Sequence, residues 1–353
     1  MIWAGQGVLY AGVSEQLTAL AEYLAAPVMT TLLGKSAFNE RHPLALGTGL
    51  HSRTTMVTDY IQECDVVFAI DASLTRTIFA PPIPLGKKII HATVDPNDIN
   101  KNYSADVPIL GDARLVLTQL LTELRSQHGE SGRPERADLE ANLSSMRARW
   151  LQRWTPKLTT DEVPINPYRV IDDLIKTVDP QTTIVTHDSG SPRDEIVPLY
   201  EPATPRGYLG WGHSTQLGFS LGAAMGAKLA APEKLMVTFM GDAAFGMVGI
   251  DVETAVREQI SILILLVNNS AMGNYQMYIP KATERYGTMY LTDNYCDVAR
   301  SLGAFAERIE QPAEIIPALE RAIEQAREGR PASLEFITRD GRFEEAAVVA
   351  GLL

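Results

Sequence analysis

The chain has 353 residues, of which 45% are hydrophobic and 21% are charged, and its formal net charge is −12. A chain of this length suggests roughly two domains, each able to bury its own core. The acidic balance argues against nucleic acid or an anionic membrane as a default partner, because both would repel it. No apolar run reaches the roughly 18 residues of a membrane helix, and no signal peptide is recognisable, so we expect a cytoplasmic protein. The two cysteines, Cys64 and Cys296, are too few for a disulfide scaffold and are expected to be reduced and buried.

Along the first third of the chain, short apolar runs alternate with helix-like stretches, a pattern typical of a parallel α/β sheet. The predicted strands are Met1–Ala4, Val28–Thr31, Val66–Ile70, Ile89–Val94 and Val107–Leu110. The predicted helices are Val13–Ala26 and Asp112–Arg125. These elements predict a first domain over residues 1–125.

Residues 126–164 differ in composition and predict a linker followed by a helix. Residues 126–134 are polar and rich in helix breakers, and the charged stretch Ala137–Trp154 predicts a helix. Pro164 and Pro167 then precede another predicted helix, Tyr168–Thr177.

A second alternating unit is predicted over residues 165–345. Its predicted strands are Thr183–His187, Leu235–Met240, Ile262–Asn268, Ala304–Ile309 and Ala332–Thr338. Its further predicted helices are Thr215–Ala231, Val252–Gln259 and Ala313–Arg327. The sequence therefore predicts an α/β protein with two doubly wound parallel-sheet domains.

Oxygen donors follow two of these strands. The strand Leu235–Met240 ends at Gly241-Asp242-Ala243-Ala244, and the next predicted strand ends at Asn268-Asn269-Ser270-Ala271. Ligands of doubly wound sheets bind at the carboxyl ends of strands, so we expect these segments to be neighbours. Asp242 offers a carboxylate, Asn269 an amide oxygen and Ala271 a carbonyl, and Mg²⁺ prefers such oxygens. Either dipeptide alone is common in turns, but both at strand ends form a stronger signal.

The stretch from Gly207 to Gly273 resembles the cofactor domain of thiamine-diphosphate (ThDP) enzymes of the acetolactate synthase/pyruvate decarboxylase superfamily. Their motif is GDG followed, after one helix and strand, by NN, and here Ala243 replaces the third glycine. The resemblance implies that Asp242, Asn269 and the carbonyl of Ala271 ligate Mg²⁺. It also implies cofactor contacts from Gly241, Asp242, Ala243, Ala244, Asn269, Ala271, Met272 and Gly273.

Two further segments agree with this resemblance. Asp188-Ser189-Gly190-Ser191 follows the first strand of the unit, where the family holds diphosphate oxygens with backbone N–H groups. Thr215 opens a predicted helix whose N-terminus can favour an anion. Leu217 falls where the family places the apolar residue that bends ThDP; the alternative is an ordinary core leucine.

The first third resembles the family's central domain, in His42-Pro43, in 46–51 and in 91–96. In acetolactate synthases this domain binds FAD, and Gly5-Gln6-Gly7 is a weak nucleotide-turn signal. The family usually has Gly-x-Arg after the strand that corresponds to Val66–Ile70, but this chain has Asp71-Ala72-Ser73. That departure disfavours FAD as a second cofactor.

Two residues are candidates for catalysis. Tyr278 stands where acetolactate synthases carry a tryptophan, so it either lines the substrate entrance or packs a loop. His213 lies just before the cofactor helix, and it is either a proton-transfer group or a loop histidine bonded to backbone.

The resemblance implies decarboxylation or carboligation of 2-oxo acids, and a homo-oligomer or a partner subunit. In the family, a glutamate from a separate pyrimidine-binding domain activates the cofactor, and nothing in this chain matches that domain. A truncated product, a misassigned start or a partner that supplies the domain would each account for this. Two other readings stay open: a 2-hydroxyacyl-CoA or oxalyl-CoA lyase, suggested weakly by residues 339–343, and a non-catalytic cofactor-binding subunit.

Overall fold

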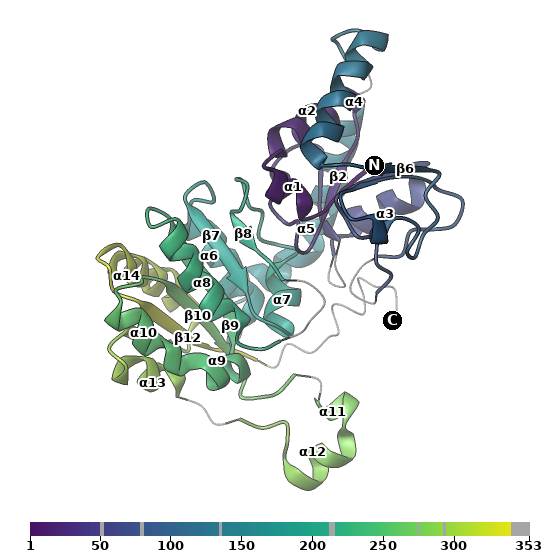
Figure 1. Ribbon diagram of the computed structural model, residues 1–353. Coiled ribbons are helices and arrows are strands. Elements are labelled where there is room, and N and C mark those ends of the chain that lie inside the picture. The colour runs from purple at the N-terminus through teal and green to yellow at the C-terminus, as the bar shows by residue number, and fades with distance from the viewer. Residues whose placement is uncertain are drawn as a thin grey trace. The chain divides into compact units, whose positions relative to one another are not determined.

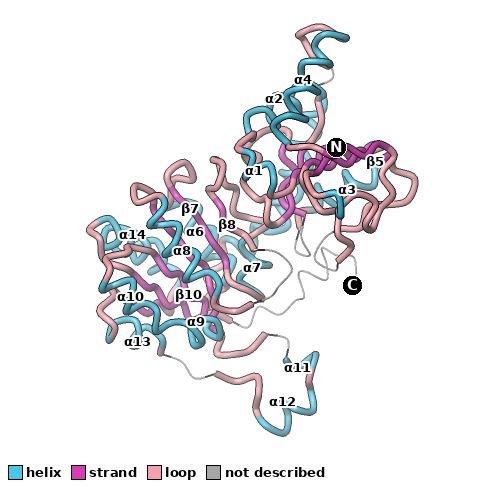
Figure 2. The backbone as a smooth tube through the Cα atoms, in the orientation of Figure 1, coloured by secondary structure: helices cyan, strands magenta, loops and turns pink. Residues whose placement is uncertain are grey.

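A computed structural model describes residues 1–49, 53–77, 81–133, 136–211, 216–273, 275–291 and 294–339. The chain divides into two compact units, one of residues 1–153 and 201–213 and the other of residues 154–200 and 214–353. Each unit has a sheet at its centre with helices packed around it (Figures 1 and 2).

The first unit is built on a parallel sheet with the strand order β3-β2-β1-β4-β5-β6. Its strands are β1 (Ile2–Ala4), β2 (Val28–Thr31), β3 (Ala45–Gly49), β4 (Val66–Ile70), β5 (Lys88–Thr93) and β6 (Val107–Leu110). Its helices are α1 (Gly7–Ala11), α2 (Ser14–Leu24), α3 (Thr55–Glu63), η1 (Pro96–Asp98), α4 (Ala113–His128) and α5 (Arg136–Leu158), the last of which runs into the second unit. The central strand β1 is buried along its whole length, as expected for a strand covered on both faces.

The second sheet has the strand order β11-β12-β10-β9-β7-β8. The second unit supplies β7 (Thr183–His187), β9 (Leu235–Gly241), β10 (Leu263–Asn268), β11 (Phe305–Ile309) and β12 (Ala332–Ile337), and the short edge strand β8 (Tyr208–Leu209) comes from residues 201–213. The helices are α6 (Pro167–Thr177), α7 (Ser191–Ile196), α8 (Phe219–Ala230), α9 (Asp242–Val248), η2 (Gly249–Asp251), α10 (Val252–Arg257), α11 (Tyr275–Tyr278), α12 (Pro280–Tyr286), α13 (Tyr295–Ser301), η3 (Pro312–Glu314) and α14 (Ile315–Arg327). Because β7, β9 and β10 are parallel neighbours, their carboxyl ends lie side by side.

The two parallel sheets confirm the predicted fold class, and the predicted strands agree with the structure to within one residue at each end. The strand β3 was not predicted, because Gly47 and Gly49 weaken the strand pattern. The predicted boundary at residues 125/126 is untested as a domain limit, but α4 continues to His128 and so covers the start of the predicted linker.

The helix predicted to begin at Thr215 begins only at Phe219, and this is a correction. Gly218 has a φ of 90°, a left-handed conformation that glycine adopts easily and that a helix interior excludes. Within the described ranges, no helix is long and apolar enough to cross a membrane.

Candidate cofactor site

Three loops of the second unit meet at the carboxyl ends of β7, β9 and β10. A Cβ atom built on Gly241, at the end of β9, would lie 3.5 Å from Cγ of Pro192, which belongs to α7 after β7. A Cβ atom built on Gly273, after β10, would lie 3.6 Å from Oγ of Ser191. The predicted segments around 190, 241 and 271 are therefore neighbours in the fold.

Asp242 is the first residue of α9, and its side chain is almost completely buried, with 3% exposed. One carboxylate oxygen accepts a hydrogen bond from the backbone N–H of Ala243 at 2.7 Å, and the other accepts one from Ala271 at 3.3 Å. Desolvation by burial raises the pKa of the Asp242 carboxyl to about 6, and the backbone N–H groups oppose that rise. A buried carboxylate of this kind gains most from a nearby cation.

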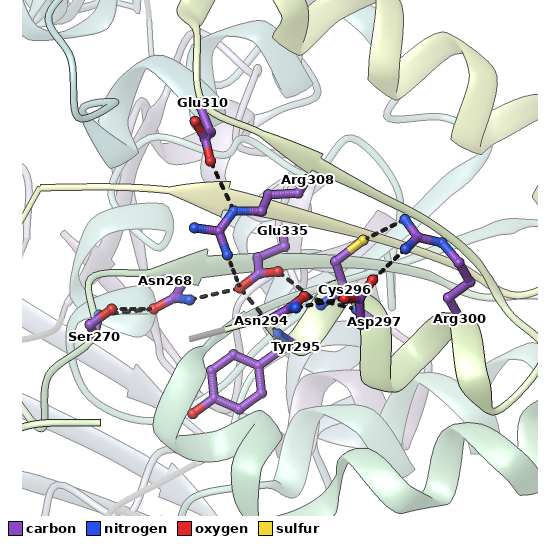
Figure 3. A network of polar contacts seen from close by, with 10 residues as sticks. All are labelled: Asn268, Ser270, Asn294, Tyr295, Cys296, Asp297, Arg300, Arg308, Glu310 and Glu335. Atoms are coloured by element: carbon purple, nitrogen blue, oxygen red, sulfur yellow. Dashed lines mark hydrogen bonds and ion pairs between the residues drawn. The ribbon is translucent and has the colours of Figure 1, made fainter. Parts of the chain in front are cut away.

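The two asparagines of the motif have different roles. The side-chain oxygen of Asn269 accepts a hydrogen bond of 3.1 Å from the N–H of Ala271, so it faces the Asp242 loop. Asn268 is turned to the other side: its amide nitrogen donates to Oε1 of Glu335 at 2.7 Å, and its oxygen accepts from the N–H of Ser270 at 2.8 Å (Figure 3). Asn268 thus shapes the turn that presents Asn269 and Ala271.

Glu335, which the sequence did not predict, holds Asn268 and the start of α13 in place through hydrogen bonds. It is completely buried on β12, and it also accepts hydrogen bonds from the backbone N–H groups of Cys296 at 2.8 Å and Tyr295 at 3.3 Å, in the first turn of α13 (Figure 3). The guanidinium of Arg308 lies 4.0 Å from the same carboxylate. The available signal was a single charged residue within a short strand of mostly apolar residues, since such a charge is buried only when it is paired.

Asp188, at the end of β7, is a second fully buried carboxylate. It accepts hydrogen bonds from the N–H groups of Ser189, Gly218 and Ser220 at 2.8–3.1 Å, and from the hydroxyl of Ser220 at 2.8 Å. The start of α8 is therefore capped by a carboxylate of the chain itself. This changes the expectation that the same N-terminus favours an external anion, because Asp188 already occupies those donors.

Residues 270–272, which follow β10, pair with residues 289–291 through antiparallel backbone hydrogen bonds. The N–H of Met272 donates to the carbonyl of Met289 at 2.7 Å, and that of Leu291 donates to Ser270 at 3.0 Å. Between these anchors the chain forms α11 and α12. Tyr278 ends α11 with 67% of its side chain exposed, so its proposed catalytic role stays a prediction.

The remaining predicted residues are placed as follows. Gly190 has a φ of 80°, and a Cβ atom built there would meet nothing within 4 Å, so space is open beside the loop that begins α7. Leu217 is partly buried just before Gly218. Ala243 and Ala244 follow Asp242 in α9, and Met272 and Gly273 follow Ala271. His213 and Thr215 lie outside the described residues.

These residues fit a magnesium ion held together with a diphosphate. In the part of the chain that the structure describes, no group of three or more His, Cys, Asp or Glu side chains could hold a metal by itself. The donors at this edge are one carboxylate, one amide oxygen and one carbonyl, and Mg²⁺ characteristically combines a few protein oxygens with phosphate oxygens and water. Space is open beside Gly190, so a ligand could contact the backbone there. Gly273, which lacks a side chain, lies close to Ser191 on the other side of the site.

The glycine turn of the first unit gives no support for FAD as a second cofactor. The turn Gly5-Gln6-Gly7 follows β1, where a dinucleotide fold binds a diphosphate, but the carboxylate of Asp71 already lies there. A Cβ atom built on Gly7 would come within 2.4 Å of Oδ2 of Asp71.

Comparisons with known families place both units. Residues 1–120 match the family described as the central domain of thiamine pyrophosphate enzymes, and residues 188–336 match the C-terminal TPP binding domain of the same enzymes. Thiamine pyrophosphate is another name for ThDP.

The chain is also similar to curated proteins over nearly its whole length. It is 34% identical to a probable acetolactate synthase large subunit of Methanocaldococcus jannaschii, over 92% of this chain and 55% of the relative. It is 31% identical to the acetolactate synthase large subunit of Corynebacterium glutamicum, over 96% of this chain and 54% of the relative. It is 30% identical to the acetolactate synthase isozyme 3 large subunit of Escherichia coli, over 97% of this chain and 59% of the relative. The chain thus spans little more than half the length of these relatives.

Proposed function

Because the chain belongs to the thiamine pyrophosphate enzymes, as their central and C-terminal domains, we propose that it binds ThDP and Mg²⁺ at the carboxyl ends of β7, β9 and β10. We further propose that it takes part in acetolactate-synthase-like decarboxylation or carboligation of 2-oxo acids. The observation that carries the proposal is the buried Asp242 beside Asn269 and Ala271.

In this proposal, Asp242, the side-chain oxygen of Asn269 and the carbonyl of Ala271 hold the metal. Backbone groups of Gly190, Ser191 and the first turn of α9 bind diphosphate oxygens, and Leu217 supports the ring system. When bound, ThDP supplies the electron sink for chemistry at the carbonyl carbon, and Mg²⁺ anchors its diphosphate. The protein orients the cofactor and excludes water around it.

The activating glutamate is proposed to come from a pyrimidine-binding domain outside the described units. Exposed apolar side chains support a covering domain near the site: Met247 is 59% exposed and Ile250 is 68% exposed, just after the metal-binding turn of α9. Apolar groups gathered around a site in this way are typical of a surface that another domain or subunit covers.

Calorimetric titration of the full chain tests the cofactor site. ThDP is expected to bind in the presence of Mg²⁺ and to lose affinity when EDTA removes the metal. Asp242→Ala should reduce ThDP affinity by about 100-fold or more, because loss of a residue that only supports a metal ligand already costs about 10–100-fold. Asp251→Ala, which removes an exposed carboxylate nine residues further along, is the matched control and should bind normally. Retained binding by Asp242→Ala would refute the site.

A second experiment separates cofactor binding from turnover. The purified chain with ThDP, Mg²⁺ and pyruvate is expected to bind the cofactor without releasing CO₂ at an enzyme-like rate. Turnover by the chain alone would refute the need for a separate pyrimidine domain. A chain that stays inactive when that domain is supplied would instead favour the non-catalytic cofactor-binding subunit.

The lyase alternative receives no support from the described residues. Of the segment 339–343, only Arg339 is described, and its guanidinium lies 3.0 Å from a carboxylate oxygen of Glu162. A homo-oligomer remains our expectation, and sedimentation of the full chain would test it.

A further inference from the structure

The buried carboxylate of Glu335 joins two segments that lie on opposite sides of it in Figure 3. Its Oε1 atom accepts a hydrogen bond of 2.7 Å from the side-chain amide of Asn268, at the end of β10. Its Oε2 atom accepts one of 2.8 Å from the backbone N–H of Cys296, in the first turn of α13. Each oxygen therefore serves a different segment, and both segments lead to the proposed metal ligands.

The first segment is the turn that presents Asn269 and Ala271. Ser270, between them, has a φ of 55°, which is uncommon for a residue other than glycine and persists only where surrounding contacts hold it. The side-chain oxygen of Asn268 supplies such contacts, because it accepts from the N–H of Ser270 at 2.8 Å and from its hydroxyl at 3.3 Å. Glu335 binds the amide nitrogen of the same side chain, so it fixes the direction of that oxygen and with it the turn.

The second segment is the start of α13, which packs against the helix that begins at Asp242. The rings of Tyr295 and Phe245 meet edge to face, with 5.7 Å between their centroids. A Cβ atom built on Gly246 would lie 3.7 Å from the hydroxyl oxygen of Tyr295. Phe245 and Gly246 both belong to α9. Because Glu335 also accepts a hydrogen bond of 3.3 Å from the N–H of Tyr295, it keeps this ring against the helix of the metal-binding carboxylate.

We propose that Glu335 is a positioning residue for the metal, because it holds Asp242 on one side and Asn269 and Ala271 on the other at a fixed spacing. The inference rests on the proposed ThDP and Mg²⁺ site and names the residue on which the geometry of that site depends. Mg²⁺ demands a near-ideal octahedron with oxygens at about 2.0–2.1 Å, whereas Ca²⁺ accepts longer and more variable distances. Loss of a Glu335 contact therefore weakens Mg²⁺ binding more than Ca²⁺ binding.

A pair of substitutions isolates the hydrogen bonds of Glu335 from its size. Glu335→Gln keeps the shape but has one acceptor oxygen, so in either orientation its NH₂ group faces a donor, from Asn268 or from Cys296. One of the two segments is then released. In the double variant Asn268→Asp/Glu335→Gln, the new amide donates to the new carboxylate while its oxygen still accepts from the N–H of Cys296. Both contacts are rebuilt with the acid and the amide exchanged.

Calorimetric titration of the full chain with ThDP, repeated over a series of Mg²⁺ concentrations, tests the proposal. Glu335→Gln should need at least about tenfold more Mg²⁺ than wild type for half-maximal ThDP binding, the size of effect that residues behind metal ligands have. The double variant should return to within about threefold of wild type. The same titrations with Ca²⁺ should show a smaller loss in Glu335→Gln. A glutamate that only stabilised the fold would produce no such difference between the two ions.

Asp173→Asn is the matched control. Asp173 is another buried carboxylate of the second unit, 1% exposed, and its cation partners Arg169 and Lys176 lie on the same helix, α6. The substitution makes the same change from carboxylate to amide without touching either segment that Glu335 holds. We expect urea denaturation to show a loss of stability, and calorimetry to show the wild-type requirement for Mg²⁺.

The outcomes separate this inference from the proposed function. A Glu335→Gln variant with the wild-type Mg²⁺ requirement, or a double variant as weak as the single one, overturns the positioning role. If Glu335→Gln does not fold, Tyr295→Leu decides together with the double variant. It keeps the backbone N–H and removes only the ring from α9, so it should raise the Mg²⁺ requirement about threefold, and an unchanged requirement overturns the role. A wild-type chain that binds no ThDP refutes the proposed function itself.

Discussion

The carboxyl-end loops of the two sheets carry aspartates in opposite circumstances. In the second unit, Asp242 lies beside an amide oxygen and a backbone carbonyl, so the edge offers oxygen ligands to a cation. In the first unit, the backbone and the carboxylate of Asp71 pack against the turn Gly5-Gln6-Gly7, so this aspartate fills space at the edge of the sheet. The comparison teaches that the parallel fold fixes where a ligand can bind, while the residues after each strand decide which ligand is accepted.

A second comparison lies within the second unit. Asp188 and Asp242 end neighbouring strands, and both are buried. The carboxylate of Asp188 accepts hydrogen bonds from backbone N–H groups and from the hydroxyl of Ser220, whereas that of Asp242 accepts them from backbone N–H groups alone. We infer that Asp188 stabilises the fold and Asp242 is kept for a ligand. The following predictions test these two contrasts.

The largest effect is expected for Asp188→Ala. The substitution leaves the buried N–H groups of Gly218 and Ser220 without an acceptor, and we expect it to lower the free energy of unfolding by about 3–5 kcal/mol. Urea denaturation gives the change in stability, and hydrogen exchange at the start of α8 locates it. Ser220→Ala removes only the hydroxyl bond and should cost about 1 kcal/mol. Equal stabilities of Asp188→Ala and wild type would refute the structural role.

The next effect is stabilisation by the ligands themselves. ThDP and Mg²⁺ at 100 times the dissociation constant should stabilise the wild-type chain by about 2.7 kcal/mol, through binding to the folded state. The Asp242→Asn variant should show no such increase, while its stability without ligand stays within about 1 kcal/mol of wild type, because the lost charge is a desolvated one. Thermal denaturation with and without ligand measures both. If ThDP and Mg²⁺ stabilised Asp242→Asn as much as wild type, Asp242 would not be a ligand-binding residue, and the proposed difference from Asp188 would be wrong.

Adjacent asparagines provide a finer test. Asn268→Ala removes the partner of Glu335 and of the Ser270 N–H, and it should destabilise the protein by about 2 kcal/mol. Asn269→Ala should change stability by less than about 1 kcal/mol and weaken Mg²⁺-dependent ThDP binding by about tenfold or more. Denaturation and calorimetry on the two variants separate these roles. If both variants lost the same stability and the same affinity, the division of roles would be wrong.

The smallest effect is expected for the stability of Asp71→Asn. Asp71 is partly exposed, and its carboxylate has no cation partner among the described residues, so its neutralisation should change the free energy of unfolding by only about 0.5 kcal/mol. Urea denaturation measures this change. A loss of several kcal/mol would contradict this expectation and would show that the charge of Asp71 stabilises the glycine turn.

Much of the architecture could be predicted from the chain alone. The runs Val67–Ile70 and Leu263–Val267 are buried along their whole length, so they carry a continuous apolar signal that marks parallel strands. The motif at Asp242 and Asn269 could be predicted because its residues directly follow two such runs. By contrast, β3 carries two glycines, and the start of α8 depends on a carboxylate 30 residues earlier in the chain, so local patterns indicated neither.

The sequence by itself determined the two parallel sheets and the oxygen donors at their edge, because apolar periodicity and residues next to strands are local properties. Only the tertiary structure decided how the neighbouring polar groups divide their roles. It turned Asn268 toward Glu335 and Asn269 toward Ala271, paired Asp188 with the first turn of α8, and set Asp71 against Gly7. The contacts of Asn268 with Glu335 and of Asp188 with α8 join residues far apart in the chain, and both follow from the need of a buried polar group for a partner that only the folded protein provides.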